Sequence, residues 1–430
     1  MKDLVKKVAV GLSTGALVAQ SLILPAFAEI SVVVTGNGSN SDNTSNIDVT
    51  KTTTVTQNNT AKVENDIDAK ANTGGNDADD NTGGDVNIDT GNAEAAVVVE
   101  NQLNSNEASV DCGGCPTDVN VEISGNGTHS DNDVNLGLKN TTWVTQDNFA
   151  KVKNDVEVKA NTGKNDADDN TGGNIDIDTG TASALAVVKN KLNANVAHVG
   201  GSGEGALELK ILGNGSNSDN TINANLANTV GIDQDNFALV DNDVEVKANT
   251  GKNDADDNTG GSVSIDTGDA EAGALVDTMA NFNLAHVEDC CELDGLVKVA
   301  GNGTESDNDV NLDLTSALYA TQDNFYKCGG HGWFPRWGEL NLFGDWGRDK
   351  DCDVDAKANT GYNDVEDSTG DPGSDPSIDT GNASTEVEVS NEANSNVFST
   401  GDAMPSLPDL DLGGEVSMEL WVALFHLLMG

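Results

Sequence analysis

A nine-residue phrase that recurs four times constrains the fold of this chain more than any other feature. The phrase Gly-Asn-Gly-[Ser/Thr]-x-Ser-Asp-Asn-[Asp/Thr] begins at Gly36, Gly125, Gly213 and Gly301, so the copies are 89, 88 and 88 residues apart. Lys-Ala-Asn-Thr-Gly and then Ile-Asp-Thr-Gly follow in every unit. Self-similarity at a fixed period indicates a repeat architecture. We divide the chain into repeats at residues 29–124, 125–212, 213–300 and 301–400, the last with an insertion at 328–352.

Within a unit the hydrophobic period is two, which predicts β-strands with one buried face. Ile175 and Ile177, for example, alternate with Asp176 and Asp178. Asn-Thr-Gly or Asp-Thr-Gly punctuates the strands, and glycine there allows a tight turn. The chain is therefore predicted to be all-β, either a β-solenoid or tandem β-sandwiches.

The composition favours the solenoid. Only 17 of 430 residues are aromatic, whereas a sandwich core about 10 Å thick is usually filled by large side chains. The inward candidates are Ala, Val, Ile, Asn and Thr, which suit a narrow interior. With coils of about 20 residues, each unit would supply about four coils, and four units would form a rod on the order of 75 Å long.

The start of the chain predicts export. Lys2, Lys6 and Lys7 precede an apolar run, and Ala26-Phe27-Ala28 supplies a cleavage site, as in a secretory signal peptide over residues 1–28. A retained membrane anchor is the alternative. Cleavage removes three Lys and one Asp and changes the net charge from −50 to −52. A charge of this sign excludes a general nucleic-acid binder.

Acidic residues recur at alternate positions in units 1 to 3. In an extended segment they would share one face, and stacked coils would bring like charges within about 5 Å of one another. A hard cation with oxygen ligands, Ca²⁺ outside a cell, would relieve this repulsion. A solvated, solubilising face is the alternative. The candidate ligands are Asp77, Asp79, Asp85, Asp89, Asp166, Asp168, Asp176, Asp178, Asp254, Asp256 and Asp266.

Two resemblances bear on these repeats. Gly74-Gly75-Asn76-Asp77 resembles the nonapeptide repeats of RTX proteins, which implies calcium bound between coils, although units 2 and 3 read Gly-Lys-Asn-Asp. Residues 30–400 as a whole look like the Asn/Gly/Asp-rich repetitive proteins of bacterial surfaces. That resemblance implies a location and a structural role.

The insertion in unit 4 concentrates aromatic and basic side chains in a chain that has few of either. Such a loop could stack on sugars or anchor a protein partner, or it could be a small local core that caps the last repeat. We expect a disulfide between Cys328 and Cys352 to close it. The candidate partner-binding residues are Trp333, Phe334, Arg336, Trp337 and Trp346.

The remaining cysteines lie in two joints between repeats. They are Cys112, Cys115, Cys290 and Cys291, whose pairing stays open. Local or intermolecular disulfides are favoured over a four-cysteine zinc site, because that site would require joints two repeats apart to meet.

Catalytic motifs are not evident in the sequence. His198 and His286 occupy the same place in two units, where unit 1 has Ser109, so we interpret them as positional. After a linker at 401–417, residues 418–430 are mostly apolar but too short to span a bilayer as a helix, so membrane contact is expected only through this tail.

We therefore expect a secreted, acidic, calcium-stabilised structural element of the bacterial cell surface or extracellular matrix, and not an enzyme. An adhesin or glycan-binding protein that uses the Trp-rich loop and a self-assembling fibre subunit are the alternatives.

Overall fold

The computed structural model describes residues 8–14, 17–22, 30–110, 118–200, 204–288, 292–329, 352–369 and 375–401, and these residues form an all-β structure.

The strands fall into four layers, which follow two short N-terminal strands. The N-terminal strands are β1 (Val8–Thr14) and β2 (Leu17–Leu22). Layer 1 contains β3 (Ile30–Thr35), β4 (Asp42–Asn72), β5 (Val86–Thr90) and β6 (Ala93–Val110). Layer 2 contains β7 (Asp118–Ser124), β8 (Asp131–Asn161), β9 (Ile175–Thr179) and β10 (Ala182–Val199). Layer 3 contains β11 (Glu204–Leu212), β12 (Asp219–Asn249), β13 (Val263–Thr267) and β14 (Ala270–Val287). Layer 4 contains β15 (Glu292–Ala300), β16 (Asp307–Cys328), β17 (Asp353–Asn359), β18 (Ser377–Thr380) and β19 (Ala383–Thr400).

Equivalent strands of successive layers pair in parallel and in register, which confirms the predicted solenoid-like repeat fold. The repeat strands are ordered β16-β12-β8-β4, β15-β11-β7-β3, β18-β13-β9-β5 and β19-β14-β10-β6, and the last sheet continues beyond β6 with β1 and β2. Identical motif positions face each other, so that Lys70 pairs with Lys159 and Lys159 with Lys247. Each sheet is therefore a stack of the same strand taken from four units.

One prediction about this stack is wrong. We expected about four coils in each unit, but one unit of about 88 residues forms a single wide coil, since the strand-to-strand step equals the repeat period. The Thr-Gly turn signals bend the chain within a coil rather than complete one. The long axis consequently runs along the strands: 31 residues of β8 span about 100 Å, whereas four layers are only about 14 Å deep.

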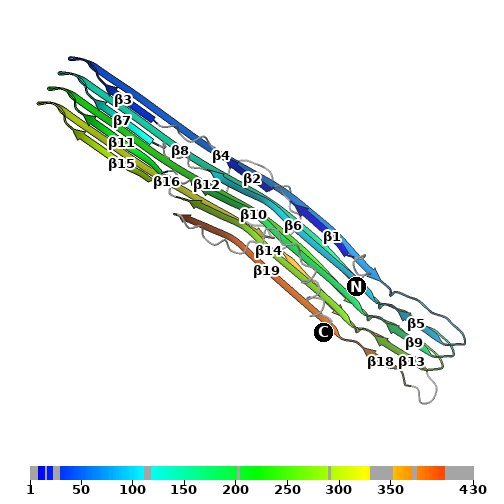
Figure 1. Cartoon of the computed structure of the whole chain (residues 1–430). Coiled ribbons are helices and arrows are strands. Elements are labelled where there is room, and N and C mark those ends of the chain that lie inside the picture. The colour runs from blue at the N-terminus through cyan, green and yellow to red at the C-terminus, as the bar shows by residue number, and fades with distance from the viewer. Residues whose placement is uncertain are drawn as a thin grey trace.

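The coil is a flattened loop whose two long sides enclose the core. One side is β8 and its equivalents, and the other is formed by β10 and its equivalents at one part and by β7 and its equivalents at another. Figure 1 shows the long strands side by side along the molecule, with β5, β9, β13 and β18 gathered at one end and β3, β7, β11 and β15 at the other.

The interior is narrow and is filled by small apolar side chains and carboxamides. Ala93, Val97, Val156 and Val244 belong to the largest apolar cluster. Between the apolar clusters, buried Asn and Gln side chains bond both across the coil and along the stack. Asn148 Nδ2 donates to Asn195 Oδ1 in its own layer at 2.8 Å and to Asn236 Oδ1 of the next layer at 3.1 Å.

The insertion of unit 4 interrupts what is one continuous strand in the other layers. β16 and β17 both pair with β12, with Cys328 opposite Val240 and Asp353 opposite Asp243. The predicted disulfide between Cys328 and Cys352 is present, with 5.8 Å between the two Cα atoms. It joins the two ends of the break, so the stack continues beyond the insertion.

The segment interpreted as a signal peptide contributes β1 and β2, and both lie parallel to β6. Among the described residues no helix is long and apolar enough to cross a membrane.

Candidate functional site

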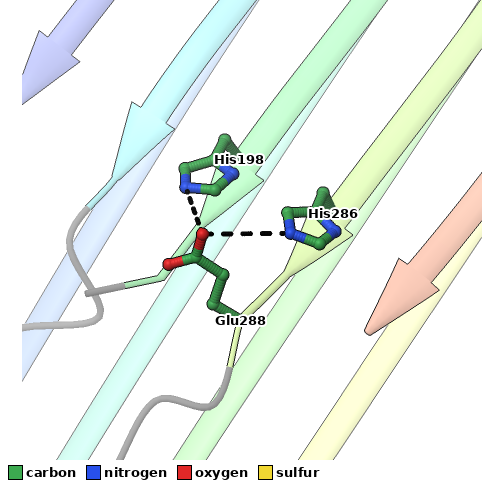
Figure 2. Close-up of side chains that lie close together, drawn as sticks. All are labelled: His198, His286 and Glu288. Atoms are coloured by element: carbon green, nitrogen blue, oxygen red, sulfur yellow. Dashed lines mark ion pairs between the residues drawn. The ribbon is translucent and has the colours of Figure 1, made fainter. Parts of the chain in front are cut away.

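Two histidines and a glutamate form a cluster where β10 and β14 end (Figure 2). His198 and His286 are register partners in neighbouring layers, and their rings stack with centroids 5.2 Å apart. Glu288 Oε1 lies 3.5 Å from His198 Nε2 and 3.9 Å from His286 Nε2. One possible metal-ligating atom from each residue lies within 4.8 Å of the other two.

A glycine in layer 2 makes room for this carboxylate. Gly200 follows β10 as Glu288 follows β14, and the two occupy equivalent places, since Gly200 N donates to Val110 O and Glu288 N to Val199 O. A Cβ at Gly200 would lie only 2.5 Å from Glu288 Cβ and 2.8 Å from its Oε2. The absence of a side chain at Gly200 therefore lets Glu288 lean from layer 3 toward His198.

The His286 ring is fully buried and is oriented from the opposite side by Ser399. His286 Nδ1 lies 2.7 Å from Ser399 Oγ, and Ser399 is its register partner in layer 4. His286 Nε2 is buried and has no hydrogen-bond partner among the residues that the structure describes. The tautomer that donates from Nδ1 to Ser399 leaves a lone pair on Nε2, on the side where Glu288 lies.

The sequence interpretation of the two histidines as positional is correct about their register but incomplete. It missed Glu288 and Gly200 as their partners. A signal was available in the sequence, namely two histidines one period apart with a glutamate two residues after the second.

The predicted calcium ligands form columns along the stack, but not on a single face. Residues 73–85 are mostly irregular, with isolated bridges at Asp77 and Thr82, rather than one extended strand. Isolated β-bridges join Asp77 to Asp166, Asp166 to Asp254 and Asp254 to Asp364, so these acids follow one another along the stack. Asp79 Oδ1 accepts from the backbone N–H of Asp168 at 2.9 Å, and Asp168 Oδ1 accepts from that of Asp256 at 2.7 Å. Asn170 and Asn258 follow these acids in the sequence, but both amides are buried in the core.

The acid columns raise the pKa values of several of their carboxyls. Burial, and then repulsion from Asp168 and Asp79, raises the pKa of Asp166 to about 6. The pKa of Asp254 is raised to about 6 by burial and then by Asp168 and Asp256. One oxygen of each, Oδ1, is buried without a hydrogen-bond partner in the described part of the chain. Binding of a proton or of a cation to the carboxylates of these columns is therefore favourable.

The remaining predicted acids lie beside or on the short strands at the same end. Asp89, Asp178 and Asp266 pair in register on β5, β9 and β13, and burial followed by these neighbours raises the pKa of Asp178. Asp176 lies on the exposed face of β9. Asp85 Oδ1 accepts from the backbone N–H of Asn174 at 2.8 Å.

The predicted partner-binding residues Trp333, Phe334, Arg336, Trp337 and Trp346 lie outside the described residues, as do Cys112, Cys115, Cys290 and Cys291 and the tail 418–430. Comparison of the chain with family models, with curated proteins and with solved structures finds no match.

Proposed function

We propose that this protein is an extracellular structural element that assembles into filaments. Copies of the chain stack end to end, with layer 4 of one copy on layer 1 of the next. This joins the expected surface or matrix role to the fibre-subunit alternative. Apart from β1 and β2, which lie on β6 within residues 1–28, the four sheets begin at layer 1 and end at layer 4. Long, flat edge strands present rows of backbone donors and acceptors that a further strand can pair with.

The observation that carries the proposal is the exposed core of layer 4. Val297, Ile378 and Val389 are 51%, 46% and 49% exposed. Their register partners in layer 3, which are Leu209, Ile265 and Val276, are at most 1% exposed. Core residues that stay apolar at an open end are the kind of surface that marks a protein interface.

Glycines at the two ends support the same arrangement. A Cβ at Gly74, Gly163 or Gly251 would lie about 2 Å from the carbonyl oxygen of the glycine in the next layer. A Cβ at Gly361, which continues this column in layer 4, would meet nothing within 4 Å. Nothing among the described residues requires glycine there, whereas a stacked copy would place its own Gly74 carbonyl at that point.

The asparagine columns have a direction that a stacked copy would continue. Asn37 donates to Asn126, Asn126 to Asn214 and Asn214 to Asn302, with Nδ2 to Oδ1 distances of 2.9, 3.0 and 3.1 Å. One end of the column therefore presents an amide nitrogen and the other an amide oxygen. Such a head-to-tail contact does not close on itself and produces filaments.

The negative charge of the chain opposes this stacking, and bound calcium would reduce that opposition. The net charge of the chain without residues 1–28 is −52, and the acid columns would run on across each contact. Calcium bound to the carboxylates around Asp166 and Asp254 would lower the repulsion between neighbouring copies. Screening by salt would also lower it, but without direct coordination of the carboxylate oxygens.

Export would also prepare the stacking surface. In the full chain β1 and β2 occupy the outer edge of β6. Cleavage after Ala28 removes them and leaves that edge available for β19 of another copy.

The experiment is electron microscopy and sedimentation velocity of the chain that begins at Glu29, in millimolar calcium. We expect filaments that lengthen with protein concentration. Gly361→Ala should shorten them, since its methyl group would collide with the next copy, while the melting temperature of the isolated chain stays the same. Gly295→Ala, also in open space in layer 4 but on the inward face of β15, is the matched control. A chain that stays monomeric at all concentrations refutes the proposal.

The position of the insertion favours a second role, partner or glycan binding through residues 329–351. Because the disulfide closes the break between β16 and β17, the loop can be replaced by a short glycine linker without interrupting β12 pairing. If the loop is an adhesive site, this variant keeps its melting temperature and loses binding to cells or glycans. Unchanged binding would exclude the loop as the site.

A further inference from the structure

We infer that His198, His286 and Glu288 form a binding site for one divalent transition metal of the zinc class, held between layers 2 and 3. This inference does not depend on stacking of copies or on calcium. The residues involved lie at the ends of β10 and β14, on different strands from the acid columns.

The donor set fits such an ion. Zinc binds imidazole nitrogen at about 2.0–2.1 Å and carboxylate oxygen at about 2.0–2.2 Å, which in tetrahedral geometry places neighbouring donors about 3.3–3.4 Å apart. The two nitrogen-to-oxygen distances are already 3.5 and 3.9 Å. The two imidazole nitrogens lie within 4.8 Å of each other, so a modest tilt of the two stacked rings completes the triangle.

The chemistry of the donors separates this site from the acid columns. Imidazole nitrogen suits zinc, copper, nickel and cobalt, whereas calcium takes oxygen ligands. We therefore expect calcium to leave the site empty and zinc to fill it, even when calcium saturates the carboxylates elsewhere.

The most buried member of the cluster lacks a partner that a metal would supply. His286 is 0% exposed, and its Nε2 has no hydrogen bond to any described residue. Ser399 holds the other ring nitrogen, as outer-shell partners of metal-bound histidines do when they select the tautomer and orient the ring. In the tautomer that donates from Nδ1 to Ser399, Nε2 carries a lone pair and lies 3.9 Å from Glu288 Oε1.

The open side of the cluster gives an ion access. The side chains of His198 and Glu288 are 25% and 34% exposed, and the three protein donors leave room for water as a fourth ligand. Layers 1 and 4 have Ser109 and Ser399 at the equivalent place, so a site of this composition arises only between layers 2 and 3 of the described stack.

The test is a zinc titration, by calorimetry, of the metal-stripped chain that begins at Glu29, in millimolar calcium. We expect one zinc ion per chain. His198→Ser, which installs the residue that layer 1 uses in the same register, should weaken binding at least tenfold and leave the melting temperature of the metal-free protein unchanged. His129→Ser, a histidine on a surface turn, is the control and should bind as the parent does. Unchanged zinc affinity in His198→Ser refutes the site.

Two further measurements keep the test decisive if a histidine substitution affects folding. Gly200→Ala leaves all three ligands in place but displaces Glu288, so zinc binding should fall about tenfold, as it does when a group that positions a ligand is lost. Cobalt bound in place of zinc should give visible absorption bands of a nitrogen and oxygen site. An intense sulfur-to-cobalt charge-transfer band in the near ultraviolet would instead assign the metal to the cysteines and overturn the proposal.

Discussion

At the scale of single residues, buried carboxamides replace the large apolar side chains of thicker cores. Gln146 is fully buried. Its Nε2 donates to Gln57 Oε1 at 2.7 Å and to Val196 O at 3.0 Å, while its Oε1 accepts from Gln234 at 2.7 Å. A primary amide carries donors and acceptors in equal measure, so identical residues one layer apart satisfy each other. The polar interior is stable because the same carboxamide recurs in every layer and each one satisfies the hydrogen bonds of its neighbour.

Gln146→Leu should lower the free energy of unfolding by about 2–3 kcal/mol, because it removes a donor from two buried acceptors and an acceptor from Gln234. Gln322→Leu is the matched control in layer 4, where the column ends. It should cost about 1 kcal/mol, since only one layer lies next to it. Urea unfolding of the two variants measures the difference. Equal losses of unfolding free energy would show that hydrogen bonds between layers do not add to the stability of the inner glutamines.

The raised pKa values of Asp166 and Asp254 predict stability that falls with pH in the absence of divalent cations. Their pKa values of about 6 in the folded chain lie above the ordinary value of 3.8, so the folded state binds these protons more tightly than the unfolded state does. Their stabilising contribution is fully present below about pH 4 and is lost as the pH rises through about 6. The melting temperature in chelator at constant ionic strength should therefore drop between pH 4 and pH 7.

The double variant Asp166→Asn, Asp254→Asn should flatten this drop. A residual slope would remain, because burial and then Asp233 also raise the pKa of Asp235 to about 6. Calcium should likewise flatten the profile of the parent chain, because a cation replaces the protons. A melting temperature that climbs from pH 4 to pH 7 in chelator would contradict this electrostatic interpretation of the columns.

At the scale of elements, the turns are stacked as tightly as the strands. In the column Gly74, Gly163, Gly251 and Gly361, each glycine of the first three layers lies against the carbonyl of the next. The turn after each long strand can therefore repeat at the strand spacing only without a side chain. This explains the glycine that ends Lys-Ala-Asn-Thr-Gly in the first three layers.

Gly163→Ala should destabilise the chain by at least about 2 kcal/mol, because its Cβ would lie 2.1 Å from Gly251 O and backbone would have to shift. Gly361→Ala makes the same chemical change without a following layer. It should stay within about 0.5 kcal/mol of the parent when the protein is monomeric. Thermal melting of both variants at low protein concentration is the measurement, and a harmless Gly163→Ala would mean that the layers are not packed this closely.

The strands themselves were predictable from the sequence, because period-two alternation reports which face of an extended segment is buried. The closure of the coil was not. Turn signals at steps of eight or nine residues predict bends, but they do not say whether a bend starts a new layer. Pairing of Lys159 with Lys247, rather than with a residue about 20 positions away, is a long-range choice made by the match between whole units.

At the scale of the whole molecule, the stack is thin, open at layer 4 and covered at layer 1 only by β1 and β2 on β6. Four layers of about 100 Å strands expose core at layer 4, whereas a closed domain would bury it. The free energy that the outer strands lack can come from another copy of the chain.

Residues 1–28 should therefore control assembly in the purified protein. The chain that begins at Glu29 should form filaments in millimolar calcium and dissociate in chelator, since a charge of −52 then opposes contact. The full chain should assemble more weakly under both conditions, because β1 and β2 lie along the edge of β6. Light scattering during a calcium titration compares the two, and equal assembly would show that this edge is not part of the contact.

The sequence by itself determined the repeat, its period, the strand faces and the Cys328–Cys352 disulfide, because each follows from local pattern or from the presence of two cysteines at the ends of one insertion. Only the tertiary structure decided that one unit makes one layer, that Asn170 points inward while Asp166 does not, and that Glu288 reaches His198. Each of these depends on which distant residues lie one strand spacing apart. In a stack, that spacing follows from the register of whole units and not from any segment of the chain.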